Sequence, residues 1–252
     1  MCSSDLNYMR DPNPLNVYYC PWNSDDSGRT WDMMYQTPTS LFEDFKERAN
    51  KQNKDDSVLH CPASSSIIKN TFVFKNPLHS EYAFTDNSVT PISTNFISLD
   101  GMTYERQISL INTRHIVLNY SYMFFSEEPL LMSLVPPYWH EPTYTKTATL
   151  FSGEFDIGQW FRPISTEFMT WKTEGTLVLE EDDPLFYTQF HTDRKVNLQR
   201  FKATPTLYNY ALECKRSPVF YGKRKSLKER YLKFNKSDLR ELILFEIKQN
   251  LV

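Results

Sequence analysis

The chain has 252 residues and a formal net charge of −3, and 15% of its residues are aromatic, with 6 glycines and 15 prolines. This composition favours strands joined by proline-containing turns over a helical bundle, and one β-rich domain with appendages can account for the length. The most apolar run, residues 129–137 ("PLLMSLVPP"), is far shorter than the roughly 20 residues of a membrane-spanning helix, so it predicts a buried strand and no membrane segment.

Residues 1–56 predict an irregular N-terminal arm with one short helix. Most of the arm is rich in Asp, Asn, Ser and Pro, and residues 15–22 ("LNVYYCPW") are its one plausible strand. Ser40 followed by Glu43 has the spacing of a capping box, and apolar residues then recur at helical spacing. We expect no cleaved secretion signal, because the first residues contain no basic segment followed by an apolar run.

Residues 57–203 predict an antiparallel β domain. In residues 115–125 ("HIVLNYSYMFF") apolar and aromatic residues alternate, as they do in a long strand with one buried face. Shorter strand-like segments follow with turn signals between them: "TATLFSG", "EFMTWKT", "TLVLEE", "LFYTQFH" and "KVNLQRF". Strands spaced in this way predict a mainly β fold, either a β-sandwich or a jelly-roll-like arrangement.

Residues 204–252 predict a C-terminal helical segment. Helical patterns occur in "TLYNYALECKR", "KSLKERYLKFN" and "SDLRELILFEIKQNLV". For the last of these, Ser237 is the predicted N-cap, Asp238 and Glu241 lie in the first turn and Lys248 lies in the last turn. Acidic residues at the start and a basic residue at the end suit the helix dipole.

The four cysteines, Cys2, Cys20, Cys61 and Cys214, are scattered without the spacing of a zinc site, so we expect free thiols in a reducing compartment and no structural zinc. Around Cys61 the β-branched and aromatic residues indicate strand structure. Neighbouring strand residues point to opposite faces, so Cys61 cannot pair with the adjacent histidine as nucleophile and base. We expect Cys61 to be buried.

Two further patterns indicate turns rather than catalysis. Gly153 and Gly158 have the spacing of a phosphate-binding loop, but Gln159 and Trp160 stand where that loop needs Lys and then Ser or Thr. The acidic residues 180–183 precede a proline, and four adjacent acids are more typical of a solvated turn than of the separated carboxylate pair of a glycosidase.

His191 and Asp193 are the main candidates for metal ligands in this sequence. On a strand they would share a face, as the site of two histidines and one carboxylate in an iron oxygenase requires. No histidine follows His191, so the third ligand would be His140 or His115, an order that the familiar oxygenase family does not use. We therefore expect no metal cofactor and predict a polar strand face with Phe186 and Phe190 on its other side; the polar residues are Tyr187, Gln189, His191 and Asp193. An iron- and 2-oxoacid-dependent oxygenase is the alternative.

Two groups of residues are candidates for a protein interface. Trp160, Phe161 and Arg162 combine flat aromatic surface with a planar cation, residue types that are frequent in binding hot spots. The competing interpretation buries the two aromatic residues and pairs Arg162 internally. Leu242 and Phe245 of the last predicted helix are the other candidates.

A basic segment offers a second kind of partner. Residues 215–236 contain nine Lys or Arg and one Glu, a local net charge of about +8. Its candidate phosphate contacts, with Tyr221 and Tyr231 available to stack on bases, are Lys223, Arg224, Lys225, Lys228 and Arg230. The negative charge of the whole chain favours the other interpretation, a solvated face of amphipathic helices.

Several strings resemble a group of uncharacterised proteins encoded by phages and some bacteria. They are "CPASSSIIKNTFVF", "FFSEEPLLMSLVPPYWHEP", "LFSGEFDIGQWFRP" and "LEEDDPLFYTQFH", and the resemblance covers about residues 57–203. It implies a phage-type origin and assigns no catalytic activity.

These observations predict a non-enzymatic interaction or structural protein, such as a phage accessory or virion-associated component, without a cofactor. Its partner would be another protein or a second copy of the chain, in the host cytoplasm or in the virion. Nucleic-acid binding through residues 215–236 and the oxygenase are the alternatives.

Overall fold

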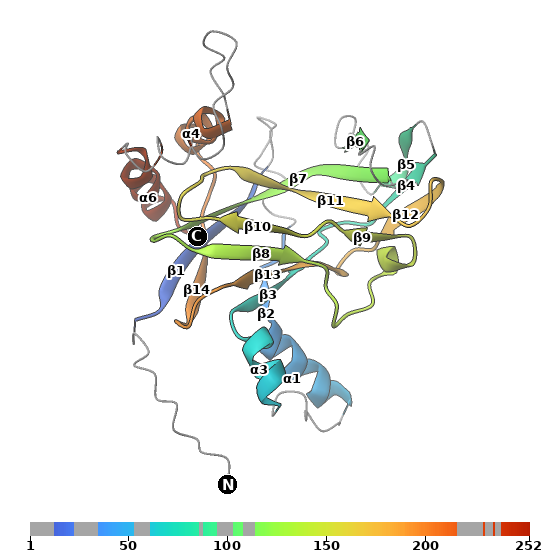
Figure 1. Cartoon of the computed structure of the whole chain (residues 1–252), viewed down its shortest axis with the longest axis horizontal. Helices are drawn as coiled ribbons and strands as arrows, with labels where there is room; N and C mark the ends of the chain where they lie inside the picture. The colour runs from blue at the N-terminus through green and yellow to red at the C-terminus, as the bar shows by residue number, and fades with distance from the viewer. Residues whose placement is uncertain are drawn as a thin grey trace.

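The computed structural model describes residues 13–22, 35–52, 61–85, 88–94, 103–107, 114–215, 229, 234 and 238–252. The fold is mainly β, with antiparallel sheets and a few helices, as the sequence predicts (Figure 1). Among the helices described, none combines the length and the apolar character needed to cross a bilayer.

The largest sheet, sheet A, has the strand order β14-β1-β7-β11-β9, and β6 also pairs with β7. β1 and β14 run parallel, and the other pairs of this sheet run antiparallel. The strands are β1 (Leu15–Trp22), β6 (Thr103–Gln107), β7 (Arg114–Ser126), β9 (Ala148–Leu150), β11 (Pro163–Thr170) and β14 (Val196–Arg200).

Two smaller sheets are antiparallel throughout. Sheet B has the order β10-β8-β13-β3-β2, and sheet C has the order β12-β4-β5. The strands of sheet B are β2 (Thr39–Ser40), β3 (Thr71–Lys75), β8 (Leu131–Val135), β10 (Gly153–Asp156) and β13 (Pro184–Phe190). Those of sheet C are β4 (Ser80–Phe84), β5 (Val89–Thr94) and β12 (Gly175–Leu179).

Sheets A and B share one apolar core. Sheet A contributes Val17 and Phe124, and sheet B contributes Phe74 and Phe186, all of them buried. The rings of Phe74 and Phe186 stack with their centroids 4.9 Å apart, and Phe74 meets Phe124 edge-on at 5.5 Å. Because the two sheets bury side chains against each other, with alternate residues of strands such as β1 entering this core, the arrangement is sandwich-like.

β7 is buried on both faces. Ile116 and Phe124 enter the core shared with sheet B, whereas Met123 and Phe125 face a second apolar cluster. That cluster includes buried side chains of α4 (Pro205–Lys215) and α6 (Leu239–Gln249), the C-terminal helices that the sequence predicts. The sequence predicted one buried face for this strand, and the helices provide the second.

α1 (Leu41–Gln52) and α3 (Pro62–Ile68) pack on the other face of sheet B. The 3₁₀ helix η2 (Thr143–Lys146) follows β8 in the sequence. Leu41 of α1 and Ile68 of α3 form a third cluster with Val73 of sheet B. Ser40 Oγ accepts a hydrogen bond from the Glu43 amide at 3.2 Å, so the predicted start of α1 is confirmed. Figure 1 shows the two helix pairs on different sides of the strands.

Two local expectations change. β1 lies inside sheet A between β7 and β14, so residues 15–22 belong to the β structure instead of an arm outside it. Residues 62–68, where strand character was expected, form α3, with Cys61 at the N-cap and Pro62 at the first helical position. Proline suits that position because its missing N–H would have no partner inside the helix.

Gly158, in the β10–β11 turn, packs closely against the backbone of the β7–β8 turn. A Cβ at this residue would lie 2.0 Å from the backbone oxygen of Glu128, whereas a Cβ at Gly153 would meet the ring of Phe155 at 2.9 Å. We expect Gly158→Ala to lower the free energy of unfolding by about 3 kcal/mol, because a backbone turn must move. Gly153→Ala is the matched control, and urea unfolding should place its loss below about 1 kcal/mol, since a side chain can shift. Equal losses for the two variants would contradict this account.

Candidate interaction surface

α6 exposes apolar side chains on the face turned away from the sheet. Leu242 is 49% exposed and Phe245 is 64% exposed, whereas Ile243 and Ile247 are fully buried. A surface helix normally keeps its apolar residues on one stripe and polar residues on the other side. α6 therefore has more apolar surface than its own packing uses.

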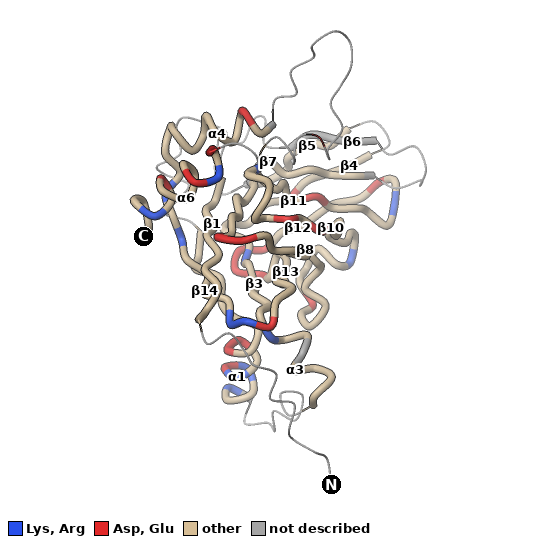
Figure 2. Tube along the Cα trace, turned by 60° about the vertical axis from the view of Figure 1, so that its left-hand side comes forward, with Lys and Arg blue, Asp and Glu red and all other residues tan. Residues whose placement is uncertain are grey.

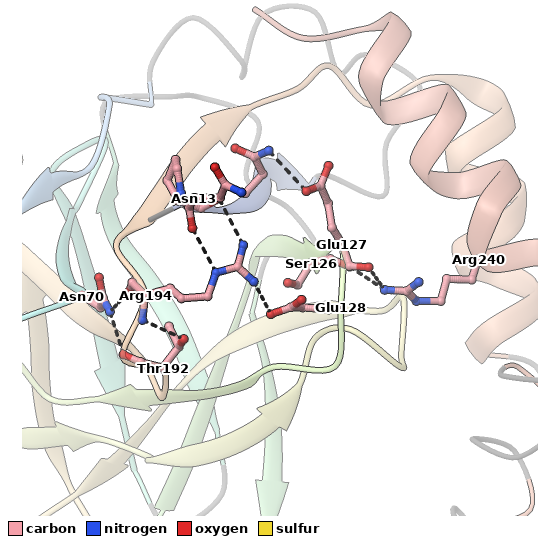
Figure 3. Close-up of polar contacts among 10 residues, drawn as sticks. Asn13, Asn70, Ser126, Glu127, Glu128, Thr192, Arg194 and Arg240 are labelled. Carbon is pink, nitrogen blue, oxygen red and sulfur yellow. Dashed lines mark hydrogen bonds and ion pairs between the residues drawn. The ribbon is translucent and has the colours of Figure 1, made fainter. Parts of the chain in front are cut away.

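Arg240 fixes the N-terminal end of α6. Its guanidinium donates from Nε to the Gly158 carbonyl oxygen at 2.9 Å and from Nη2 to the Ser126 carbonyl oxygen at 3.2 Å, and it also contacts the carbonyl of Glu127. Figure 3 shows Arg240 reaching from α6 toward the turn that contains Ser126 and Glu127. One cation thus joins α6 to the β7–β8 turn and the β10–β11 turn.

The Glu127 carboxylate, in the same β7–β8 turn, contacts residues of β1 and α6. Its carboxylate accepts hydrogen bonds from Tyr18 Oη at 2.8 Å and Asn16 Nδ2 at 3.2 Å, and Lys248 Nζ lies 2.7 Å from Oε1. Burial by itself would raise the pKa of Glu127, but the contacts with Lys248, Tyr18 and Asn16 outweigh it and lower this pKa. Burial, together with Glu127, raises the pKa of Tyr18. β1, β7 and α6 are held by one ionised carboxylate.

The last residues fix the other end of α6. The Lys202 amide donates to the Asn250 carbonyl at 2.9 Å, and the Val252 amide donates to the Arg200 carbonyl at 3.0 Å. Thr204 Oγ1 donates to Glu246 at 2.8 Å. Residues 250–252 therefore continue from the helix onto the edge of β14, and α6 is anchored at both ends.

Charges of both signs accompany the apolar pair. Figure 2 shows basic and acidic residues on α6. Glu241 in the first turn and Lys248 in the last turn are both exposed, as are Leu242 and Phe245 between them. The predicted N-cap, Ser237, lies outside the described residues, and Asp238 occupies the N-cap position without a side-chain cap hydrogen bond.

The second group of interface candidates is divided. Phe161 is fully buried beside Trp22 and Phe125, so its prediction as an interface residue is wrong. Trp160 and Arg162 are half-buried, and the Arg162 guanidinium lies 5.3 Å from the centre of the Trp160 ring. This pair presents only part of its surface, so α6 is the better candidate.

His191 and Asp193 lie past the end of β13, on an exposed loop instead of a strand face. His191 Nε2 is 2.6 Å from Ser133 Oγ, and the Asp193 carbonyl accepts from Lys69 Nζ at 2.6 Å. Tyr187, assigned to the same polar face, is fully buried. The prediction of one polar face for these residues is therefore wrong, although Phe186 and Phe190 enter the core as expected.

Arg194 and Asn70 hold this loop (Figure 3). Arg194 donates to the Asn13 carbonyl at 3.0 Å and pairs with Glu128 at 2.9 Å, while Asn70 Nδ2 donates to the carbonyls of Thr192 and Arg194 at 3.0 and 2.7 Å. The loop is thereby joined to the start of β1 and to the β7–β8 turn.

His140 is engaged elsewhere. Its Nε2 lies 3.1 Å from Asp44 Oδ2, its Nδ1 contacts the Tyr187 hydroxyl, and Arg48 Nε lies 3.0 Å from the same Asp44 oxygen. Burial would raise the pKa of Asp44, but His140 and then Arg48 lower it. These contacts attach α1 to sheet B and to the segment after β8.

His115, the other proposed ligand, is buried in sheet A with its ring 5.0 Å from that of Phe151. Within the described ranges, no group of three or more His, Cys, Asp or Glu is arranged to hold a metal ion. The oxygenase alternative therefore lacks its predicted ligand set among these residues.

Cys61 is exposed, so the prediction of burial is wrong. Hydrogen bonds from the backbone amides of Ser64 and Ala63, and from the Ser64 hydroxyl, lower the pKa of its thiol. Burial raises the pKa of Cys214 to about 11.

The acidic turn is confirmed, since residues 180–183 lie between β12 and β13.

The five basic candidates for nucleic-acid contact lie outside the described residues.

Comparisons with protein-family models, with curated proteins and with solved structures found no match to this chain.

Arg240 should be needed to hold α6 in place. We expect Arg240→Ala to lower the free energy of unfolding by about 2 kcal/mol, because three backbone carbonyls lose a charged donor. Lys248→Ala is the control on the same helix. It removes an ion pair whose side chains are 50% and 30% exposed, so its loss should stay below about 1 kcal/mol. Chemical denaturation of both variants measures the difference, and a larger loss for Lys248→Ala would contradict this ranking.

Proposed function

We propose that this chain is a non-enzymatic interaction or structural protein that associates with a second copy of itself through the outward face of α6. The observation that carries the proposal is the exposure of Leu242 and Phe245 on a helix that is anchored at both ends. Removing apolar surface from water contributes about 25 cal/mol of favourable free energy per Å², so a complex in which a partner covers this pair is stabilised.

The charges beside the apolar pair favour a second copy over an unrelated surface. Glu241 and Lys248 are seven residues apart and lie at opposite ends of the exposed stripe. In an antiparallel pair of α6 helices related by a twofold axis near residues 244–245, Glu241 of one copy approaches Lys248 of the other, and the reverse contact is equivalent. Lys248 also pairs with Glu127, but with side chains 50% and 30% exposed this ion pair is weak enough to be shared.

The resemblance of residues 57–203 to phage-encoded proteins supplies the biological setting of the proposal. In that setting the chain is a phage accessory or virion-associated component, located in the host cytoplasm or in the virus particle. Most soluble oligomers are symmetric homo-oligomers, and a twofold pair of α6 helices fits that pattern.

The direct test is the oligomeric state in solution. We expect a dimer whose dissociation constant rises at least tenfold in the double variant Leu242→Ser and Phe245→Ser, because the apolar contact is lost. Light scattering coupled to size-exclusion chromatography over a range of protein concentrations measures this. Glu241→Lys should weaken the dimer as well, by placing two cations opposite each other.

The matched control is Ile92→Ser, which removes an apolar side chain that is 57% exposed on β5, away from α6. This variant should dimerise like the unmodified chain. A chain that is monomeric at every concentration contradicts the proposal. Co-purification of nucleic acid that high salt releases would favour the basic segment instead.

A further inference from the structure

β3, β4, β12 and β13 form one long two-stranded ribbon with a bend. β3 pairs with β13 in sheet B, and β4, which follows β3, pairs with β12, which precedes β13, in sheet C. The two strands of the ribbon are interrupted at the same place, at residues 76–79 in one and 180–183 in the other. Sheet C is therefore joined to sheet B through this bend.

Asn76 replaces the ladder hydrogen bonds that are missing at the bend. Its amide donates to the Asp183 carbonyl at 2.8 Å, and its carbonyl accepts from the Asp182 amide at 3.0 Å. Its buried side chain donates to the carbonyls of Leu78 and Glu180 at 2.5 and 2.9 Å. Asp182 has a φ of 67°, a left-handed conformation that lets the chain turn here.

His79 contacts one carboxylate with each ring nitrogen, at the end of the bend that adjoins sheet C. Nδ1 lies 2.7 Å from Glu180 Oε2, at the end of β12, and Nε2 lies 3.2 Å from Glu81 Oε1, on β4. A neutral imidazole carries one N–H and can donate to only one of these carboxylates, whereas an imidazolium donates to both. The geometry therefore fits the protonated ring.

The surroundings of His79 are acidic. Of the other acids in the 180–183 turn, Glu181 is exposed, Asp182 binds the Gln36 side chain, and Asp183 accepts from the Thr143 amide at 2.9 Å. The strands β5 and β12 contain no charged residue. The hydrogen bond with Glu180 raises the pKa of His79, and Glu81 adds to this effect against the opposing influence of burial.

We propose that His79 is a proton-dependent lock between β4 and the end of β12, where sheet C adjoins the bend. The imidazolium bridges Glu81 and Glu180 and holds β4 against the residue that follows β12. Loss of the proton leaves one N–H for two carboxylates, so one bridge is released and this end of the β4–β12 pair opens more readily.

The direction of the pH dependence follows from the raised pKa. Stabilisation of this end of sheet C is fully present below the ordinary histidine pKa of about 6.5 and is lost as the pH rises through the value in the folded chain. Each unit by which the pKa is raised corresponds to about a tenfold change in the equilibrium between locked and released states.

Two measurements test the lock on the full chain. Proton NMR titration of the His79 ring should give a pKa above the ordinary value, and Glu180→Gln and Glu81→Gln should each bring it down. Amide hydrogen exchange should show protection factors of β4 and β12 that fall, by about tenfold per unit of pKa shift, as the pH rises through the His79 pKa. Amides of β1 and β7 serve as the internal reference.

The variants separate a lock from a merely structural histidine. His79→Gln cannot be protonated, so the extra pH dependence of β4 and β12 should disappear. His191→Gln, which removes an imidazole bonded to Ser133 instead of a carboxylate, should leave it unchanged. The proposal is overturned if His79 titrates at or below the ordinary value, or if it titrates while the protection of β4 and β12 stays constant.

Discussion

The burial of β7 on both faces is the constraint on which the other layers depend. Successive residues of a strand point to opposite sides, so this strand sends Phe124 into the core with sheet B and Phe125 toward the C-terminal helices. A register shift of one residue would exchange the two sets, and both interfaces would have to repack together. Sheet B, sheet A and the α4–α6 pair are thus positioned by the same strand.

Polar contacts then fix the ends of these layers, and most of them meet at the turn that follows β7. Arg240 and Arg194 come from distant parts of the sequence, and they bind carbonyl groups and a carboxylate of residues 126–128 (Figure 3). Lys248 pairs with the carboxylate of Glu127 in the same turn. Buried carbonyl groups need partners, and a guanidinium satisfies several at once. Because Gly158 also contacts this turn, the positions of α6, β10 and β8 are coupled.

The elements that the sequence predicts well are those with a local signal. The alternation in β7 and the Ser40 cap of α1 are local patterns, and both are confirmed. The place of β1 inside sheet A was not predictable, because its parallel partner β14 lies at the other end of the chain. Arg240 was not predicted as an anchor because its partners are backbone carbonyls, which every residue type has. Pro62 at a helix start was a signal for α3, but the surrounding β-branched residues favoured a strand. Residue type alone also did not separate the buried Phe161 from the exposed Phe245.

The arrangement of α6 explains why exposure, more than aromatic content, identifies its surface. Ile243 and Ile247 form the buried stripe with Leu239 partly covered beside them, a spacing of four residues that fills the face toward sheet A. Leu242 and Phe245 lie outside that stripe, so they widen the apolar sector without adding to the packing on the sheet. A helix that is apolar on two sides suits a position between two apolar surfaces. Sheet A is one of them, and the second copy in our proposal is the other.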